Sequence, residues 1–332
     1  MAGCRVLLLY PNERDVSLVP PVLGLFAALL RAGGHETTLF DCTGYDMEGK
    51  ADPDIEREKA LFIKPTGPST DKRVKKKLTN MYDDFTQKVQ TFSPDLIAVS
   101  VTESTFLRGV SLLNHLRLIK KHNILTIMGG VFPTFAPDRA FREPSVDIVC
   151  VGEGDVALVE LCENLERSKD FSRISNLWIK KSDGTTVKNT IGPAVDINSL
   201  PAIDFSIFED DRFYRPMRGK SYRMFPIETH RGCPYTCTFC NSPSQNVLYD
   251  AQTQSNFFRK ASVEKIREEI VNKKTSGMEN IFFSGLTPFL LGARKNLLNS
   301  VKCILSSSFL FGASHAQKPF LMQQAVIKNS KC

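Results

Sequence analysis

Short apolar runs alternate with amphipathic stretches through the first half of the chain. Five apolar segments predict strands, at residues 4–11, 36–41, 93–102, 124–130 and 146–154. Between them, residues 20–34 predict a helix with proline at its start and glycine at its end, and residues 104–122 predict an amphipathic helix. Asp155 is expected to cap a further helix. This alternation predicts a doubly wound, Rossmann-like α/β domain with a parallel sheet.

The pattern changes after this region. Residues 176–189 predict a β-hairpin with Asp183-Gly184 at its turn, because Asp-Gly between alternating segments is a strong hairpin signal. A stretch containing proline follows, and its apolar residues, among them Phe205 and Phe213, are expected to anchor it to the protein surface. It is interpreted as a wrapped linker.

The last third predicts further strands and helices. Residues 224–230 predict a strand, residues 261–277 a helix, and residues 279–285 a second strand. The chain is therefore divided into residues 1–170, which form the doubly wound domain, residues 171–222, which form the hairpin and linker, and residues 223–332.

Composition and charge narrow the class of protein. Hydrophobic residues make up 42% of the chain and charged residues 24%, which is typical of globular proteins and excludes a disordered chain. The net charge is +7, and the basic run at residues 71–78 is interpreted as a solvated helix face, with a nucleic-acid surface as the alternative. No apolar run reaches the ~18 residues of a membrane span, so a cytoplasmic location is expected.

The loops that follow the predicted strands are candidate ligand sites, because ligands of doubly wound sheets bind beyond the carboxyl ends of the strands. Glycine there lets a ligand approach the backbone closely, although the same glycines also suit plain turns. Neither G-x-G-x-x-G after the first strand nor a P-loop motif is present, which disfavours a dinucleotide and a P-loop nucleotide. The candidate residues are Thr102, Gly129, Gly130, Gly152, Glu153 and Gly154.

Three of the nine cysteines are clustered. Cys233, Cys237 and Cys240 have the spacing C-x3-C-x2-C, and thiolates are soft ligands that suit iron–sulfur clusters, zinc or copper(I). Three thiolates can hold three irons of a [4Fe–4S] cube and leave one iron open. A zinc site would need a fourth ligand, for which Cys303 and Cys332 are the distant candidates.

The segment RGCPYTCTFC, with Phe239 before the last cysteine, resembles the signature of the radical S-adenosylmethionine (SAM) enzymes. The resemblance implies that the open iron binds SAM, and that an electron from the reduced cluster cleaves the sulfonium to a 5′-deoxyadenosyl radical. It also implies that Phe239 lies near the adenine. Ser284 and Gly285, at the end of the second predicted strand, match the family's element that contacts the SAM amino group.

The first half extends the resemblance to the cobalamin-binding radical SAM proteins, over residues 1 to about 285. The strand-end segments that resemble that family lie at residues 20–24, 129–138 and 146–155. The motif D-x-H-x-x-G, which supplies a histidine to cobalt in many other cobalamin proteins, is absent. The expected fold is thus a cobalamin-binding-type doubly wound domain followed by a radical SAM (β/α) barrel. The barrel is expected to be partial, with a truncated or atypical C-terminal region, because fewer strand–helix units fit than the family's usual number.

The leading functional hypothesis is a cobalamin-dependent radical SAM methyltransferase acting on a small-molecule substrate. It implies a [4Fe–4S] cluster, SAM and cobalamin as cofactors, and an electron donor such as ferredoxin or flavodoxin. The alternatives are a radical SAM cyclase or oxidoreductase, and a non-catalytic family member that binds cobalamin or a cluster. A nucleic-acid binder with a zinc knuckle is a further reading; it predicts zinc in place of iron and a steep salt dependence.

Overall fold

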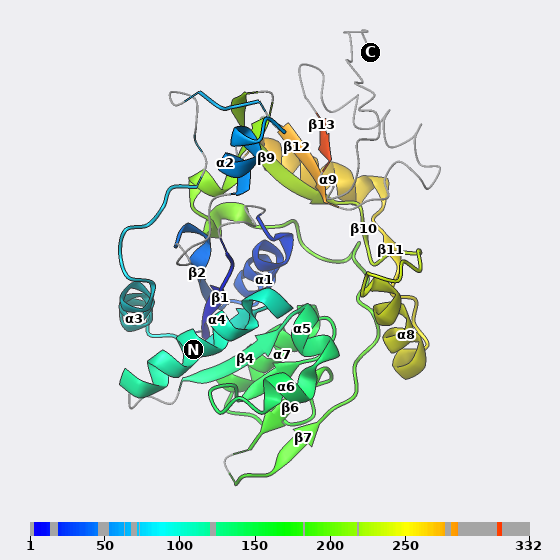
Figure 1. Ribbon diagram of the computed structural model, residues 1–332. Helices are drawn as coiled ribbons and strands as arrows, with labels where there is room; N and C mark the ends of the chain where they lie inside the picture. The colour runs from blue at the N-terminus through cyan, green and yellow to red at the C-terminus, as the bar shows by residue number, and fades with distance from the viewer. Residues whose placement is uncertain are drawn as a thin grey trace.

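The first half of the chain folds around one seven-stranded sheet (Figure 1). The computed structural model describes residues 3–13, 19–45, 53–62, 64–67, 72, 74–119, 124–181, 183–217, 219–275, 280–284 and 311–313. The strands are β1 (Arg5–Tyr10), β2 (Glu36–Asp41), β3 (Leu96–Ser100), β4 (Leu125–Gly129), β5 (Ile148–Cys150), β6 (Leu177–Lys180) and β7 (Thr186–Lys188). They lie in the order β2-β1-β3-β4-β5-β6-β7. The five predicted strands and the hairpin are confirmed.

The first five strands are parallel, and the hairpin β6–β7 adds two antiparallel strands at the edge beside β5. The order β2-β1-β3-β4-β5 places the topological switch point between β1 and β3, where ligands of such sheets bind. The doubly wound fold class predicted from the sequence is therefore confirmed.

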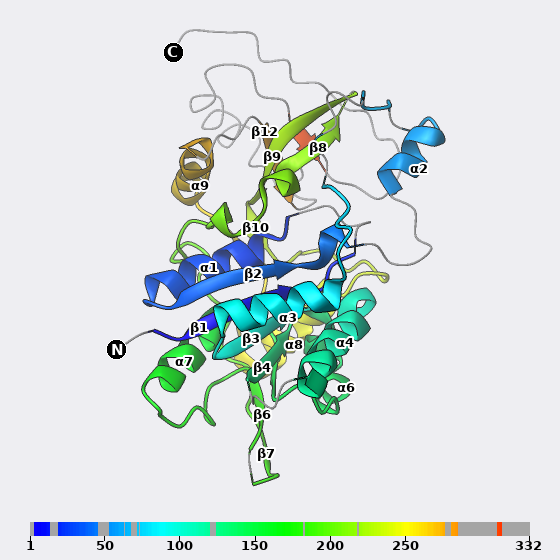
Figure 2. The ribbon, with the colours of Figure 1, turned by 90° about the vertical axis from the view of Figure 1, so that its left-hand side faces the viewer.

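Apolar side chains cover both faces of the sheet, as the continuous apolar strands require. Val6 and Leu8 belong to one core with α1 (Pro21–Ala32) and α7 (Asp155–Glu166). Leu7 and Leu9 belong to the other, with α3 (Met81–Phe92) and α4 (Glu103–Ile119), so helices lie on opposite sides of the sheet (Figure 2). The short helices α5 (Val131–Phe135) and α6 (Pro137–Phe141) follow β4 directly.

The basic run does not form the predicted helix. The part between α2 (Pro53–Lys59) and α3 that the structure describes includes residue 72 and residues 74–78, which carry no helix or strand. The Nζ atom of Lys77 lies 2.7 Å from a carboxylate oxygen of Glu209, and the backbone N–H of Lys75 donates to Asp211 at 3.1 Å. The run packs against acidic residues of the linker because those carboxylates attract it.

The linker wraps onto the protein through buried aromatic rings, as predicted. The short 3-10 helices η2 (Phe205–Ile207) and η3 (Asp210–Phe213) place two buried phenylalanines, Phe205 and Phe213, next to Phe225. The ring of Phe213 stacks on that of Phe225 with centroids 4.4 Å apart, and Phe205 contacts both. The linker is therefore part of the core rather than a free tether.

The last third builds a second sheet in the order β13-β12-β9-β8. Its strands are β8 (Tyr214–Met217), β9 (Lys220–Glu228), β12 (Asn280–Ser284) and β13 (Phe311–Ala313). Strands β9, β12 and β13 are parallel, and α9 (Val263–Thr275) packs on β9, which confirms the two predicted strands and the helix between them. The antiparallel strand β8 was not predicted.

Between β9 and α9 the chain makes an excursion. It passes through β10 (His230–Arg231), the cysteines and α8 (Ser242–Thr253), and returns through β11 (Arg259–Lys260), which pairs antiparallel with β10. Among the described residues, no helix is long and apolar enough to cross a membrane.

Candidate functional site

The three clustered cysteines lie on one exposed loop, residues 232–241, between β10 and α8. The loop begins at Gly232, whose φ is +82° and where a Cβ would lie 2.7 Å from the carbonyl oxygen of Phe257. The side-chain amide of Asn246 donates to the carbonyl of Cys233 at 2.9 Å, and the N–H of Cys240 donates to the carbonyl of Cys237 at 3.2 Å. The side chain of Asn246 on α8 therefore holds the start of the loop, and a backbone turn forms near its end.

The side chains of the loop are available to a ligand. Cys237 and Cys240 are exposed and Cys233 is half-buried, and the ring of Phe239 is 79% exposed. In the part of the chain that the structure describes, no three His, Cys, Asp or Glu side chains are grouped as a metal site, so the thiols do not converge in this conformation. The donor chemistry fits an iron–sulfur cluster, since all three donors are thiols on one accessible loop.

The second predicted contact to SAM lies on the neighbouring strand. Ser284 is the last residue of β12 and pairs in register with Glu228, the last residue of β9. Because β9 and β12 are parallel, both residues lie at the same edge of the sheet, the edge from which the chain continues to the cysteine loop. Gly285 lies outside the described residues.

The other predicted residues lie at the carboxyl edge of the first sheet, where its parallel strands end. Thr102 lies after β3 and directly before α4. Its N–H donates to the hydroxyl of Thr105, in the first turn of α4, at 2.9 Å. Gly129 ends β4, and a Cβ there would lie 3.3 Å from the Cβ of Cys150 on the neighbouring strand. Gly154 is the N-cap of α7.

Two of these glycines are required by contacts within the chain. Gly130 has φ +112°, and a Cβ there would lie 2.4 Å from the carbonyl oxygen of Val101. Gly152 has φ +86°, and a Cβ would lie 2.7 Å from the hydroxyl oxygen of Tyr249. Both positions need glycine because a side chain would meet neighbouring protein atoms.

An exposed apolar surface adjoins this edge. Leu107 on α4 and Val131 and Phe135 on α5 expose their side chains, and the rings of Phe106 and Phe132 between them pack with centroids 4.6 Å apart. Both helices begin directly after a parallel strand. Apolar side chains are therefore exposed on the helices that follow β3 and β4.

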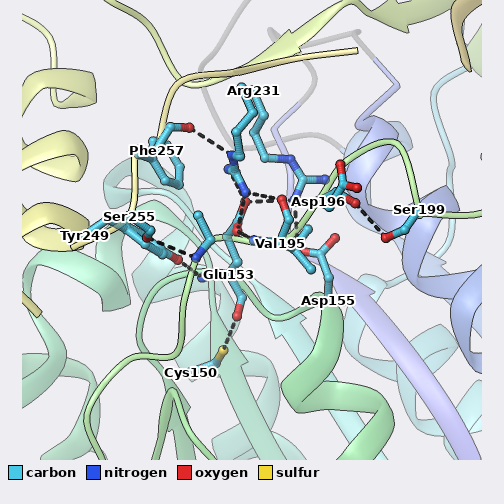
Figure 3. Close-up of polar contacts among 12 residues, drawn as sticks. Cys150, Glu153, Asp155, Val195, Asp196, Ser199, Arg231, Tyr249, Ser255 and Phe257 are labelled. Carbon is cyan, nitrogen blue, oxygen red and sulfur yellow. Dashed lines mark hydrogen bonds and ion pairs between the residues drawn. The ribbon is translucent and has the colours of Figure 1, made fainter. Parts of the chain in front are cut away.

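Glu153 is the centre of a polar cluster that joins the two parts of the chain (Figure 3). Arg259 contacts both oxygens of its carboxylate, at 2.8 and 2.6 Å, and Arg231 donates to Oε1 at 2.9 Å. The N–H of Val195 in the linker donates to Oε2 at 2.9 Å, and the N–H of Glu153 itself donates to the hydroxyl of Tyr249 at 2.7 Å. The predicted site residue Glu153 thus contacts α8, β10, β11 and the linker.

The same cluster changes the predicted role of Asp155. The N-cap of α7 is Gly154, and Asp155 makes no cap hydrogen bond; the expected cap is wrong. Its side chain, only 4% exposed, accepts a hydrogen bond from Arg231 at 2.9 Å. Asp155 stands in the first turn of α7, where its charge also complements the helix dipole.

Charge within the cluster determines the protonation of Glu153. Burial alone would raise the pKa of this carboxyl, but the guanidinium groups of Arg259 and Arg231 outweigh it and hold the pKa below its ordinary value of 4.5. Burial raises the pKa of the Tyr249 hydroxyl, so this group stays neutral and can accept the hydrogen bond from the N–H of Glu153.

A pH dependence follows for stability. Because the folded-state pKa of Glu153 is depressed, its stabilisation is fully present above pH 4.5 and is lost as pH falls through the folded value. We expect Glu153→Gln to lower the free energy of unfolding by about 3 kcal/mol at neutral pH. The difference from the unmodified protein should shrink as pH falls below 4.5, in urea titrations compared across pH. A difference that stays constant or widens in acid would contradict this assignment.

The sequence did not indicate Arg231, Arg259 or Tyr249 as site residues. Their partner, Glu153, is 78 and 106 positions away from the two arginines in the chain, so no local periodicity connects them. The position of Arg231 two residues before Cys233 was the one available signal.

The chain matches one family model, the B12 binding domain, over residues 70–162. Curated relatives include an uncharacterized methyltransferase of Pyrococcus horikoshii, 25% identical over 57% of this chain and 39% of the relative. The cobalamin-dependent radical SAM methyltransferase TokK of Streptomyces tokunonensis is 27% identical over 57% of this chain and 27% of TokK. The anaerobic magnesium-protoporphyrin IX monomethyl ester cyclase of Synechocystis is 24% identical over 71% of this chain and 42% of the cyclase.

Solved structures share the fold. The radical SAM methyltransferase TsrM of Kitasatospora setae, solved with cobalamin and a [4Fe–4S] cluster, aligns with a TM-score of 0.59 at 17% identity, over 91% of this chain and 51% of TsrM. The cobalamin-dependent SAM radical enzyme OxsB, solved with aqua-cobalamin and SAM, aligns with a TM-score of 0.61 at 17% identity, over 93% of this chain and 38% of OxsB.

The chain combines a doubly wound domain that matches the B12 binding domain with parallel strands that lead to a cysteine loop. It is a relative of the cobalamin-binding-domain radical SAM proteins, as its sequence suggested. It spans less than half the length of the curated relatives described above.

Proposed function

We propose that Cys233, Cys237 and Cys240 hold a [4Fe–4S] cluster through three of its irons. The observation that carries the proposal is the position of the cysteine loop, which leaves the carboxyl end of β9 through β10 and exposes its thiols there. Three thiolates leave the fourth iron open to a chelating ligand. Such a cluster, when bound, would supply the electron that cleaves SAM, and the protein would supply placement and exclusion of water.

SAM would bind between this loop and the end of β12. The exposed ring of Phe239 can pack against the adenine, and the backbone at Ser284 and Gly285 can contact the amino group of SAM. The pairing of Ser284 with Glu228 supports this arrangement, because it places the end of β12 beside the strand that leads to the cysteines.

Cobalamin would bind at the carboxyl edge of the first sheet. Thr102, Gly129, Gly130, Gly152 and Gly154 line this edge, and the apolar surface of Leu107, Val131 and Phe135 suits a large apolar macrocycle. The carboxylate of Glu153 is engaged by two arginines, so Glu153 acts here by fixing the loop rather than by contacting the ligand with a free charge.

The reaction we propose is methyl transfer to a small-molecule substrate. TokK and TsrM are both methyltransferases by name, and each aligns with more than half of this chain. Reductive cleavage of SAM consumes one electron, which a ferredoxin or flavodoxin would deliver. The cyclase relative supports ring-forming oxidation as the second candidate, since it matches 71% of this chain.

Anaerobic reconstitution tests the proposal. The purified chain would be supplied with iron, sulfide and hydroxocobalamin, and the EPR spectrum of the reduced protein recorded with and without SAM. We expect a [4Fe–4S]⁺ signal that shifts when SAM is added, and cobalamin that stays with the protein on gel filtration. A cluster that ignores SAM would refute SAM binding, and zinc in place of iron would refute the radical SAM assignment.

Product analysis separates the two candidate reactions. SAM carrying a labelled methyl group should transfer the label to protein-bound cobalamin if the chain is a methyltransferase. Conversion of SAM to 5′-deoxyadenosine with no label on cobalamin would favour the cyclase-type reaction.

A further inference from the structure

The cysteine loop belongs to a larger excursion, residues 232–258, here named the cysteine segment. It follows β10, which comes after β9 of the second sheet, and ends at β11, and these two strands pair over only two residues each. Their register joins His230 with Lys260 and Arg231 with Arg259. Because a two-stranded ribbon is marginally stable at best in water, so short a pairing does not fix the segment by itself.

Glu153 supplies the missing constraint. Arg231 and Arg259 are register partners on opposite strands of the ribbon, and both guanidinium groups converge on the Glu153 carboxylate (Figure 3). The contact with Arg259 is bidentate, the geometry in which arginine and carboxylate bind most strongly. Glu153 thus links the two strands at the base of the cysteine segment, whereas Asp155, the other carboxylate of the cluster, contacts Arg231 alone.

The backbone of Glu153 contacts α8, the helix within the cysteine segment. The N–H of Glu153 donates to the hydroxyl of Tyr249 on α8, whose side chain is 1% exposed and packs against Phe257 with ring centroids 4.7 Å apart. Tyr249 and Phe257 belong to the hydrophobic core of the first sheet, on the side of α3 and α4. One residue of the loop between β5 and α7 therefore contacts the segment at its start, its helix and its end.

The linker reinforces this attachment. The N–H groups of Ile191 and Ala194 donate to Gln252 and Ser255 at 3.2 Å each, next to the end of α8. These contacts involve neutral groups, which contribute less than charge-assisted hydrogen bonds. Among the described polar contacts between the cysteine segment with its two flanking strands and the first domain, those of Glu153 and Asp155 with the two arginines are the charge-assisted ones.

We propose that Glu153 is a positioning residue that sets where the cysteine loop stands relative to the carboxyl edge of the first sheet. It does so through Arg231, Arg259 and Tyr249, without touching a reacting atom. The functional importance of this placement rests on the proposed function, because the carboxyl edge and the cysteine loop are the two proposed cofactor sites. The placement itself concerns only this chain's own residues and can be measured without cofactors.

Backbone hydrogen exchange of the full-length protein tests the placement. We expect Glu153→Gln to accelerate exchange in residues 231–259 by about tenfold or more, because the guanidinium of Arg259 loses its carboxylate partner and only Asp155 is left to pair with Arg231. Exchange in β1 and β3 should stay unchanged. Asp41→Asn is the matched control: Asp41 is 11% exposed against 12% for Glu153, and pairs with Arg212 of the linker at 2.7 Å. This control should leave residues 231–259 unaffected.

A second variant guards against loss of the fold. Tyr249→Phe removes only the hydroxyl that accepts from the N–H of Glu153, and it should accelerate exchange in residues 149–155 and 242–253. Unchanged exchange in residues 231–259 of Glu153→Gln would overturn the inference. So would acceleration that is equal across the whole protein, or equal in Asp41→Asn.

Pulsed EPR tests whether the position of the cysteine loop sets the distance between the two proposed cofactors. In reconstituted protein, Glu153→Gln should keep its iron content, since its cysteines are intact, while the distance distribution between the reduced cluster and cob(II)alamin broadens. Asp41→Asn should retain the narrow distribution. An unchanged distribution in Glu153→Gln would overturn the inference. If the unmodified protein takes up no cluster, the proposed function fails, whereas the exchange result still decides the role of Glu153.

Discussion

Replacing Cys237 by alanine is expected to reduce the iron bound after reconstitution to background and to remove the EPR signal. Cys237 is the middle donor of a loop that offers three thiols, and each must hold one iron of the cube. Two thiolates from an exposed loop leave two irons without protein ligands, so the cluster is lost rather than weakened. Iron and sulfide analysis together with EPR measures the effect.

The distant cysteines provide the matched controls. Cys303→Ala and Cys332→Ala also remove a thiol each, and both should keep the full iron content and the response to SAM. The structure does not describe these two residues, and the proposed cluster does not use them. Zinc binding that disappears in Cys237→Ala and in either control would instead indicate a four-thiolate zinc site.

Replacing Gly130 by alanine is expected to destabilise the protein by about 2–6 kcal/mol. Its φ of +112° and ψ of −170° lie in a region that only glycine occupies readily, which costs about 1–3 kcal/mol for another residue. The new Cβ would also lie 2.4 Å from the carbonyl oxygen and 3.0 Å from the nitrogen of Val101, and such overpacking costs about 1–3 kcal/mol more. Both neighbours are backbone atoms, so they cannot rotate away.

A substitution at Gly34 separates the cost of backbone strain from the cost of overpacking against Val101. Its φ is +81°, also positive, but nothing lies within 4 Å of the Cβ position. Gly34→Ala should therefore cost only the backbone strain, about 1 kcal/mol. Urea denaturation of both variants gives the comparison. Equal losses at the two positions would show that contact with Val101 contributes nothing.

Local patterns were sufficient for most of the first domain. Residues 36–41 form β2 with the predicted bounds, and the hairpin turn lies at Asp183-Gly184. These elements are predictable because each carries a local residue signal, a run of β-branched and apolar residues in β2 and Asp-Gly at the hairpin turn. The same reasoning succeeded for α9, whose apolar face packs against β9.

The remaining differences have tertiary causes. The basic run reads as a helix from its charge pattern, but Lys77 pairs with Glu209, 132 positions away, and the segment follows the linker instead. Asp155 reads as a cap, yet Arg231 offers a stronger partner than the helix N–H groups. Both depend on groups that approach only after the linker has wrapped, and a sequence window contains neither partner.

Some residues of the candidate site could also be predicted from local sequence, whereas others depend on tertiary contacts. The cysteine spacing indicated the loop directly, since the chemistry of three thiols depends on local sequence. Glycines 130 and 152 were interpreted as strand-end residues, but the reason for glycine lies with Val101 and Tyr249, which only the fold brings near. Glu153 was chosen for its loop, while its contacts with two arginines could not be read from the pattern.

The two ends of the cysteine segment lie side by side, which makes the segment a site where insertions and deletions are tolerated. Because β10 and β11 lie side by side, residues can be added to or removed from the segment without moving β9 or α9. Closing a longer loop costs little, about 0.6 kcal/mol for each doubling of its length. Variation in length is therefore tolerated within the segment, whereas a single inserted residue in β9 would turn its buried side chains to the opposite face of the sheet.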